Sequence, residues 1–277
     1  MSDALSHSVE VVRAGDPDRY LSDLFAPADA RPHLFALHAF AVEVAGVRAK
    51  VSEPTLGEVR LKWWESALRG DHGGSPVAAA LSETIAQFGL PIAAFDSLLR
   101  ARVFDLYDDP MPTLNDLEGY AGDTESTVMQ LGAMILAGGK ESGTAELAGY
   151  AGVARAITSV LRSLARNAAS GRPFLPADLL ARHGANERDA IAGKATPAVR
   201  AVLADLTARA RDRLREARAA ATDLDPALLP AFLPAAMVEV YLKRTGRPGF
   251  DPLRDPVEVS PLIRQWTLWR AARRGRL

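Results

Sequence analysis

The sequence predicts an all-α protein with a single domain. Apolar residues recur at helical spacing through nearly all of the 277 residues, and no stretch shows the strict alternation typical of a strand. The breaks are short, and none is a low-complexity linker. With 48% hydrophobic residues, the chain can bury the core of one large domain.

Several helix starts carry a capping residue followed by proline. Ser75-Pro76, Thr196-Pro197 and Ser260-Pro261 place a side-chain oxygen before a proline at the first helical position, where its missing N–H costs nothing. We expect residues 1–19 to be a flexible N-terminus and residues 20–277 to form the domain. The periodicity predicts helices at 28–50, 54–69, 76–88, 92–107, 114–137, 144–169, 197–221, 226–244 and 261–273.

Composition excludes several classes of protein. The formal net charge is −1, which gives no general attraction for nucleic acid. The absence of cysteine excludes disulfides and thiolate metal sites and fits a reducing compartment. The polar N-terminus resembles neither a signal peptide nor an arginine-rich transit peptide, so we expect a cytoplasmic bacterial protein.

One acidic residue stands inside an apolar helix. From His33 to Val47 only His33, His38 and Glu43 are polar, and these 15 residues are too few to span a bilayer. This pattern predicts a helix at the centre of the bundle. A buried Glu43 needs a cation, for which Arg60 and Arg162 are the candidates, or else water in an open cavity.

The segment 151–176 resembles a motif of the squalene/phytoene synthase family. Its ending, G-R-P-F-L-P, is similar to the family's G-R-x-Y-L-P, and Arg162 matches the arginine of the preceding R-D-x-x-E-D. However, Ser163 stands at the first Asp, and Arg166 and Asn167 replace the Glu-Asp pair. The resemblance therefore implies a prenyl synthase site whose second cluster of magnesium ligands is missing.

The first cluster is missing as well. His38-Ala39-Phe40 resembles the Y-A-F that opens the family's first aspartate motif, but Ala45, Gly46 and Ala49 fall on its Asp positions. A magnesium cluster needs several carboxylate oxygens. We therefore expect no metal, no cofactor and no catalytic residue.

Two further segments resemble the family. Asp105 lies in a stretch similar to its G-M-x-x-D-L, and Tyr120 and Glu125 lie in one similar to its L-x-x-Y-C-x-x-V-A-G-x-V. The resemblance implies an isoprenoid-synthase-like helical bundle with a remnant pocket. The candidate residues for this pocket are Glu43, Arg48, Arg60, Asp105, Tyr120, Glu125, Arg162, Arg166 and Asn167.

The segments 39–64, 120–128 and 266–270 also resemble a degenerate branch of the family, to which a mitochondrial assembly factor of respiratory complex I belongs. That branch lacks the aspartate clusters and has a Glu at the position of Glu43. The resemblance implies a non-catalytic assembly factor whose partner is a protein client of a respiratory membrane complex. The alternatives are a prenyl (farnesyl or geranylgeranyl) diphosphate transferase that uses Mg²⁺, and a carrier of an isoprenoid or other lipid.

Arginines mark one face of the long helix. Arg155, Arg162 and Arg166 are spaced to lie on a single stripe. This stripe is either a solvated basic face or a pocket that binds a phosphate or diphosphate directly.

Tryptophans occur as two pairs, Trp63 with Trp64 and Trp266 with Trp269. Such residues usually pack in the core, and otherwise they mark a partner surface or a membrane interface. The last turn of the chain adds four arginines that would meet anionic lipid in a peripheral contact with an inner membrane: Arg270, Arg273, Arg274 and Arg276.

Overall fold

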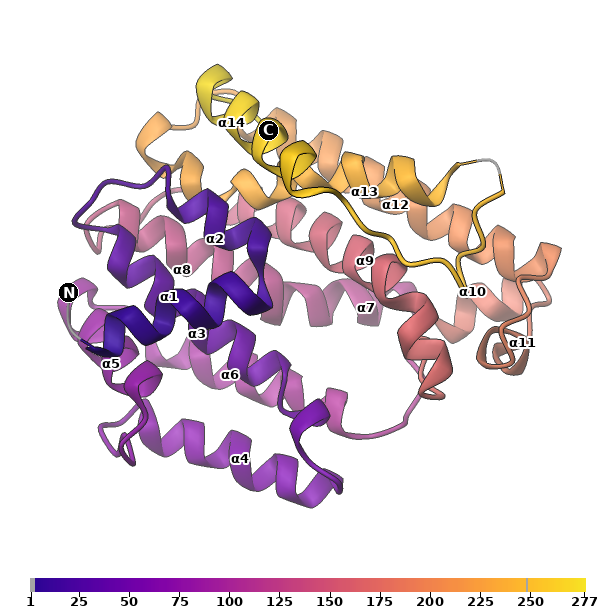
Figure 1. The fold of residues 1–277 in the computed structure, drawn as a ribbon, viewed down its shortest axis with the longest axis horizontal. Helices are drawn as coiled ribbons and strands as arrows, with labels where there is room; N and C mark the ends of the chain where they lie inside the picture. The colour runs from indigo at the N-terminus through magenta and orange to yellow at the C-terminus, as the bar shows by residue number, and fades with distance from the viewer. Residues whose placement is uncertain (1–2, 248) are drawn as a thin grey trace.

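The structure is a computed structural model and describes residues 3–247 and 249–277 (Figure 1). Most of these residues are helical and none lies in a strand, which confirms the prediction of a single-domain all-α protein. The α-helices are α1 (Asp3–Gly15), α2 (Pro17–Asp23), α3 (Arg31–Ala45), α4 (Pro54–Ala67), α5 (Pro76–Phe88), α6 (Ile92–Val103), α7 (Leu114–Ala121), α8 (Thr127–Leu136), α9 (Ala145–Ala169), α10 (Ala177–Arg182), α11 (Glu187–Ile191), α12 (Pro197–Ala220), α13 (Val238–Thr245) and α14 (Pro261–Arg274). Shorter segments are the 3₁₀ turns η1 (Arg48–Lys50), η2 (Phe104–Leu106), η4 (Pro226–Ala231) and η5 (Leu233–Met237) and the π turn η3 (Gly122–Ser126).

The predicted cap–proline starts are confirmed. The side chains of Ser75, Thr196 and Ser260 accept hydrogen bonds from the backbone N–H three residues later, at 3.3, 3.2 and 3.4 Å. Each cap satisfies one of the N–H groups that a helix start leaves without a partner. Helices α5, α12 and α14 therefore begin where the sequence predicts.

Two of the long predicted helices are interrupted. The stretch 114–137 is divided into α7, η3 and α8, because the backbone widens into a π turn at Gly122–Ser126. The stretch 226–244 is 3₁₀ over most of its first half, where Pro230 and Pro234 lack the N–H that a continuous α-helix needs.

The N-terminus differs from the flexible segment predicted over residues 1–19. Residues 3–15 form α1, which packs against α3 and α5, and Val12 is fully buried. A Cβ atom on Gly15 would lie 2.3 Å from Cγ1 of Val42, so this close approach of α1 to α3 requires glycine. Residues 1 and 2 lie outside the described residues.

The core has two large parts. One surrounds α3, where the ring of Phe40 packs against Trp64 and Phe95 at centroid distances of 5.1 and 5.5 Å. The other lies mainly between α9 and α12. A smaller cluster joins η5 to α14, and Figure 1 shows α14 along the upper edge of the molecule and α4 along the lower edge.

The helix from His33 to Val47 was predicted to lie at the centre of the bundle. Its middle does, because Leu34 through Ala41 are buried. Towards its end Glu43 is half-buried and Ala45 is exposed. Among the described helices, none has the length and apolar character that crossing a bilayer requires.

Candidate functional site

A cleft of about 720 Å³ lies between the carboxyl end of α3 and the middle of α9. Its further walls come from the turn between α1 and α2 and from the segment that precedes α14. The charged side chains that line it are Asp16, Asp18, Arg19, Arg102, Glu125, Arg155, Arg162, Arg166, Arg254 and Glu258.

The turn between α1 and α2 supplies acids to the cleft. Asp16 is the N-cap of α2 and accepts a hydrogen bond from the backbone N–H of Arg19 at 3.1 Å, with Pro17 at the first helical position. This is the same cap–proline pattern that marks α5, α12 and α14. Asp16-Pro17 is thus a local signal for the start of α2. It lies within residues 1–19, which we expected to be flexible.

Asp16 and Glu125 form a buried ion-pair network with two arginines. Glu125 Oε2 lies 2.8 Å from Nε of Arg155 and 3.1 Å from Nη2 of Arg19, and Asp16 pairs with both arginines. The side chains of Arg19, Arg155, Asp16 and Glu125 are between 4% and 18% exposed. The carboxylates and guanidinium groups of this network therefore neutralise each other's charge, and solvent contributes little.

These pairs shift the pKa values of their members. Burial by itself raises the pKa of Asp16, but the guanidinium groups of Arg155 and Arg19 outweigh it and lower the pKa to about 2. Burial likewise opposes ionisation of Glu125, and Arg19 and Arg155 again hold its pKa below the ordinary value. For Arg155, burial lowers the pKa, but Asp16 and Glu125 raise it above its ordinary value. The network is thus ionised in the folded protein.

The π turn places Glu125 opposite Arg155. Thr127 Oγ1 donates a hydrogen bond to the carbonyl of Gly122 at 3.0 Å within this turn. Gly152 of α9 packs directly on the turn, since a Cβ atom there would lie 2.2 Å from Oγ of Ser126. The glycine lets α9 approach the turn closely enough for Arg155, one turn further along, to reach Glu125.

A second network surrounds Asp18, which is 2% exposed. Tyr241 donates its hydroxyl to the Asp18 carboxylate, with distances of 2.8 and 2.9 Å to its two oxygens, and Nε of Arg264 lies 2.7 Å from Oδ1. Arg162 pairs with Asp18 at 3.7 Å and lies over the Tyr241 ring at 3.7 Å from its centroid. Burial, and then the Asp18 charge, raises the pKa of Tyr241. Asp18 therefore ties α2 to α9, α13 and α14.

A third group contains Asp105 and Tyr120, two of the predicted candidates. The Tyr120 hydroxyl donates to Asp105 at 2.7 Å and accepts from Arg102 at 2.6 Å, and Arg102 also pairs with Asp105 at 3.1 Å. Burial raises the pKa of Tyr120 well above its ordinary value. Of these three residues only Arg102 lines the cleft, and the candidates Asp105 and Tyr120 lie behind it as its partners.

The loop 171–176 does not line the cleft. Arg172 pairs with Asp108 at 3.0 Å and donates a hydrogen bond to the Tyr107 carbonyl. Phe174 adopts a positive φ of 55°, a left-handed conformation uncommon for a residue other than glycine. The loop that resembles the family's G-R-x-Y-L-P therefore fixes the end of α9 against the segment after α6.

Glu43 does not have the partner expected from the sequence. Within the described residues it forms no ion pair with Arg60, which is exposed on α4, or with Arg162, which pairs with Asp18 instead. The Glu43 side chain is half-buried and does not line the cleft. Water therefore reaches this carboxylate, so it needs no cation.

The remaining candidates are divided between the cleft and its surroundings. Arg162 and Arg166 line the cleft, whereas Asn167 does not. Arg48 donates to the Val51 carbonyl at 3.4 Å within the turn that follows α3. Of the predicted basic stripe, Arg155 is engaged in ion pairs, and Arg166 is exposed beside Ser163 at 3.0 Å.

The residues in the cleft do not fit a magnesium cluster. Ala45, Gly46, Ser163 and Arg166 line it at positions where the family's motifs have acids, and among them only Ser163 offers a side-chain oxygen. Arg166 brings a positive charge, which repels a divalent cation. Over the described residues, no group of three or more His, Cys, Asp or Glu side chains is placed to hold a metal ion.

Comparison with known proteins agrees with the fold. The family model for squalene/phytoene synthase matches residues 12–267. A dehydrosqualene synthase bound to a ligand superposes with a TM-score of 0.85 at 18% identity, covering 98% of this chain and 95% of that one. Squalene synthase HpnC from Alicyclobacillus acidocaldarius superposes with a TM-score of 0.72 at 23% identity, covering 98% and 94%. These structures show an isoprenoid-synthase-like bundle.

Two kinds of relative share a similar level of identity with the chain. The human NADH dehydrogenase (ubiquinone) complex I assembly factor 6 is 30% identical over 272 residues, which cover 95% of this chain and 81% of that protein. A phytoene synthase of Thermus thermophilus is 29% identical over 248 residues, which cover 88% and 84%. Together with the family-model match, these relatives show that the chain belongs to the squalene/phytoene synthase family.

Proposed function

We propose that this chain is a non-catalytic member of the family that acts in the assembly of a respiratory membrane complex, complex I. The observation that carries the proposal is the chemistry of the cleft. The two motif segments that supply carboxylates for metal in the family's pattern contribute Ala45, Gly46, Ser163 and Arg166 here. Without those ligands, the cleft lacks the means to hold a Mg²⁺ ion against a diphosphate leaving group.

Three of the four acids that line the cleft are engaged in ion pairs, and the fourth, Glu258, is exposed. Asp16 and Glu125 neutralise Arg19 and Arg155, and Asp18 is held by Arg264 and Tyr241. A carboxylate that already accepts several charge-assisted hydrogen bonds has little capacity left for a metal ion. These networks join α2 to the helices around it, so they favour a structural role.

The identity of the relatives supports the assembly role. Complex I assembly factor 6 from human is 30% identical to the chain, and the Bos taurus protein is 30% identical over 249 residues. In this proposal the partner is a protein client of complex I, the chain needs no cofactor, and it works in the bacterial cytoplasm beside the inner membrane.

A second candidate function is a carrier for a prenyl diphosphate or other lipid phosphate. The lining side chains include six arginines and four acids, which leaves a positive excess. In the part of the chain that the structure describes, Nε of Arg102 and Nε of Arg162 are buried without a hydrogen-bond partner. Guanidinium N–H groups of this kind can bind a phosphate without a metal. The third possibility, a Mg²⁺-dependent prenyl transferase, has the phytoene synthase relative in its favour and the cleft chemistry against it.

The experiment that tests the assembly role uses cells of the source organism that lack this chain. We expect the amount of assembled complex I and its NADH:quinone activity to fall, and to return when the wild-type chain is supplied. Isoprenoid products should be unchanged in the same cells. Normal complex I together with a missing squalene- or phytoene-derived product would instead establish the enzyme.

A further inference from the structure

Helix α14 exposes large apolar side chains along one stripe. Leu262, Trp266 and Trp269 are 77%, 60% and 41% exposed, at spacings that place them on the same side of the helix. The two tryptophan rings stack with centroids 5.1 Å apart. Leu268 and Ala271 on the opposite side are buried against η5. The expectation of core packing therefore holds for Trp64, which is fully buried, and not for Trp266 and Trp269.

The same helix is strongly basic. Helix α14 and the residues after it contain arginines and no acidic residue. Arg264 points inward and pairs with Asp18. The other four are exposed, and within the described residues none of them forms an ion pair: Arg270, Arg273, Arg274 and Arg276.

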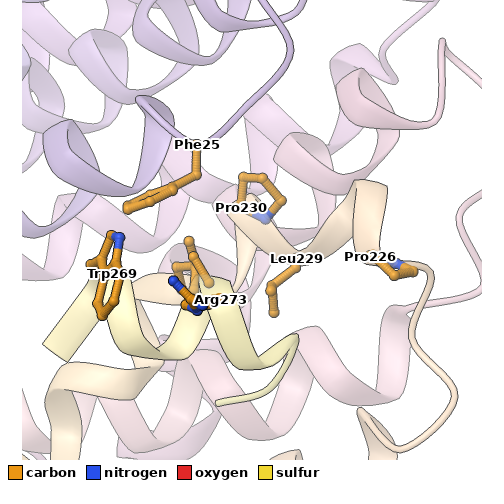
Figure 2. A pocket seen from close by; sticks show the side chains of 8 residues that line it. Phe25, Pro226, Leu229, Pro230, Trp269 and Arg273 are labelled. Carbon is orange, nitrogen blue, oxygen red and sulfur yellow. The ribbon is translucent and has the colours of Figure 1, made fainter.

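A groove of about 410 Å³ extends the exposed apolar surface toward α2. Figure 2 shows Phe25 and Trp269 at one end, Leu229 and Pro230 along the wall, and Pro226 at the other end. The one charged side chain that lines the groove is Arg273, whose guanidinium lies 5.4 Å from the centre of the Trp269 ring. Asp225 is the residue before Pro226, and Figure 2 shows Pro226 at the end of the groove away from Trp269.

The loop after α2 supplies two exposed apolar side chains, of which Phe25 lines the groove. Leu24 and Phe25 are 42% and 40% exposed. We define the α14 face as these two residues, the exposed apolar stripe of α14 and the four unpaired arginines. It combines apolar side chains, a pair of tryptophans and positive charge.

We propose that the α14 face docks the protein on the surface of a bilayer that contains anionic phospholipid. Tryptophan favours the interface between headgroups and acyl chains, and apolar side chains beside it enter the boundary of the hydrocarbon. Arginines at the same level attract anionic headgroups. A helix with this combination lies in the plane of the interface.

The charge of the face argues against a second copy of the chain as its occupant. A two-fold contact would bring two identical sets of four unpaired arginines together, with no acid on α14 to offset them. An anionic bilayer supplies the missing counter-charge. The proposal needs only this face, so it stands whether or not the chain serves complex I.

The test is co-sedimentation of the full chain with vesicles. We expect binding to vesicles of phosphatidylcholine mixed with phosphatidylglycerol, weak binding to phosphatidylcholine alone, and release at high salt. The double variant Arg270→Gln/Arg273→Gln should weaken binding about tenfold or more. Its matched control is Arg60→Gln/Lys62→Gln, which removes the same charge from exposed positions on α4, at the opposite edge of the molecule in Figure 1.

A second pair of variants tests the apolar part of the face. Trp266→Ala should also weaken binding, and in the wild type the tryptophan emission should shift to the blue when anionic vesicles are added. Leu56→Ala, at a position 51% exposed on α4, is the control. Melting temperatures equal to the wild type confirm that each variant is folded.

Three results would overturn the proposal. The first is no binding of the folded wild type to anionic vesicles, and the second is equal loss of binding in the α4 controls. The third is a wild-type dimer that Trp266→Ala converts to a monomer without any binding to vesicles, which would make the face a contact between copies.

Discussion

Arg155 and Glu125 lie 30 residues apart in the chain, and Nε of Arg155 is 2.8 Å from Oε2 of Glu125. Their side chains are 14% and 18% exposed. The π turn at Gly122–Ser126 and the close packing of Gly152 create this pair. Both residues line the cleft, so ion pairs within the chain occupy part of its wall.

Removing Arg155 should destabilise the protein strongly. Arg155→Ala leaves Glu125 and Asp16 buried with only part of their counter-charge, and breaking such a pair costs about 3–5 kcal/mol. The control is Arg215→Ala on α12, where a 69% exposed arginine pairs with Asp212 and the expected cost is about 0–1 kcal/mol. Urea denaturation measures both. Equal costs in the two variants would mean that the Arg155 network adds nothing to the fold.

The network should also give the stability a specific dependence on pH. The pKa of Asp16 is lowered from 3.8 to about 2, so its ionised form stabilises the folded state above pH 4. This contribution, about 2 kcal/mol, is lost as the pH falls toward 2. The gap in unfolding free energy between the wild type and Asp16→Asn should therefore narrow from pH 4 to pH 2.

Burial raises the pKa of Asp23, which acts in the opposite sense. The Asp16 charge adds to this rise, but burial is the largest cause and is present in both proteins. Denaturant curves at several pH values provide the measurement. A gap that stays constant over this range would show that Asp16 is not the ionised partner of Arg155 and Arg19.

Alanine substitutions at two glycines of α9 should change the stability of the protein in opposite directions. A Cβ atom at Gly152 would meet Ser126 Oγ at 2.2 Å, so Gly152→Ala should cost about 1–3 kcal/mol. A Cβ atom at Gly149 would meet nothing within 4 Å, so Gly149→Ala should stabilise the helix by up to about 1 kcal/mol. Thermal unfolding of the two variants compares them. A stabilising Gly152→Ala would mean that α9 does not pack tightly on the π turn.

Alanine substitutions at Glu43 and at Asp18 should lower the free energy of unfolding by different amounts. Glu43 is half-buried and outside the ion-pair networks, so Glu43→Ala should cost about 1 kcal/mol or less. Asp18→Ala leaves Arg264 and the Tyr241 hydroxyl without their acceptor and should cost about 3–5 kcal/mol. A larger loss for Glu43→Ala, measured by urea denaturation, would restore the idea of a buried Glu43–arginine pair.

The helices could be predicted because their signals are local. Ser75, Thr196 and Ser260 mark helix starts through contacts that span three residues, and the apolar spacing of α5, α9 and α12 follows from one helix turn. Pro230 and Pro234 could have indicated the 3₁₀ turns, since proline disrupts a helix interior.

The ion pairs of the cleft could not be predicted, because their partners are distant in the chain. Arg19 meets Glu125 across 106 residues, and Arg264 meets Asp18 across 246. No spacing rule connects such positions. The acids of the α1–α2 turn have partners that are equally distant, since Asp16 pairs with Arg155 of α9 and Asp18 with Arg264 of α14. The start of α2 does have a local signal, Asp16-Pro17, which the prediction for residues 1–19 did not use.

A cleft without metal ligands should not catalyse prenyl condensation, and a product assay decides whether it does. The purified chain is incubated with Mg²⁺ and farnesyl or geranylgeranyl diphosphate, and the phytoene synthase of Thermus thermophilus serves as the positive control for phytoene formation. We predict no squalene, phytoene or cyclopropyl diphosphate intermediate above a control without protein. Formation of any of these products by the chain, above that control, would show that the cleft is an active site.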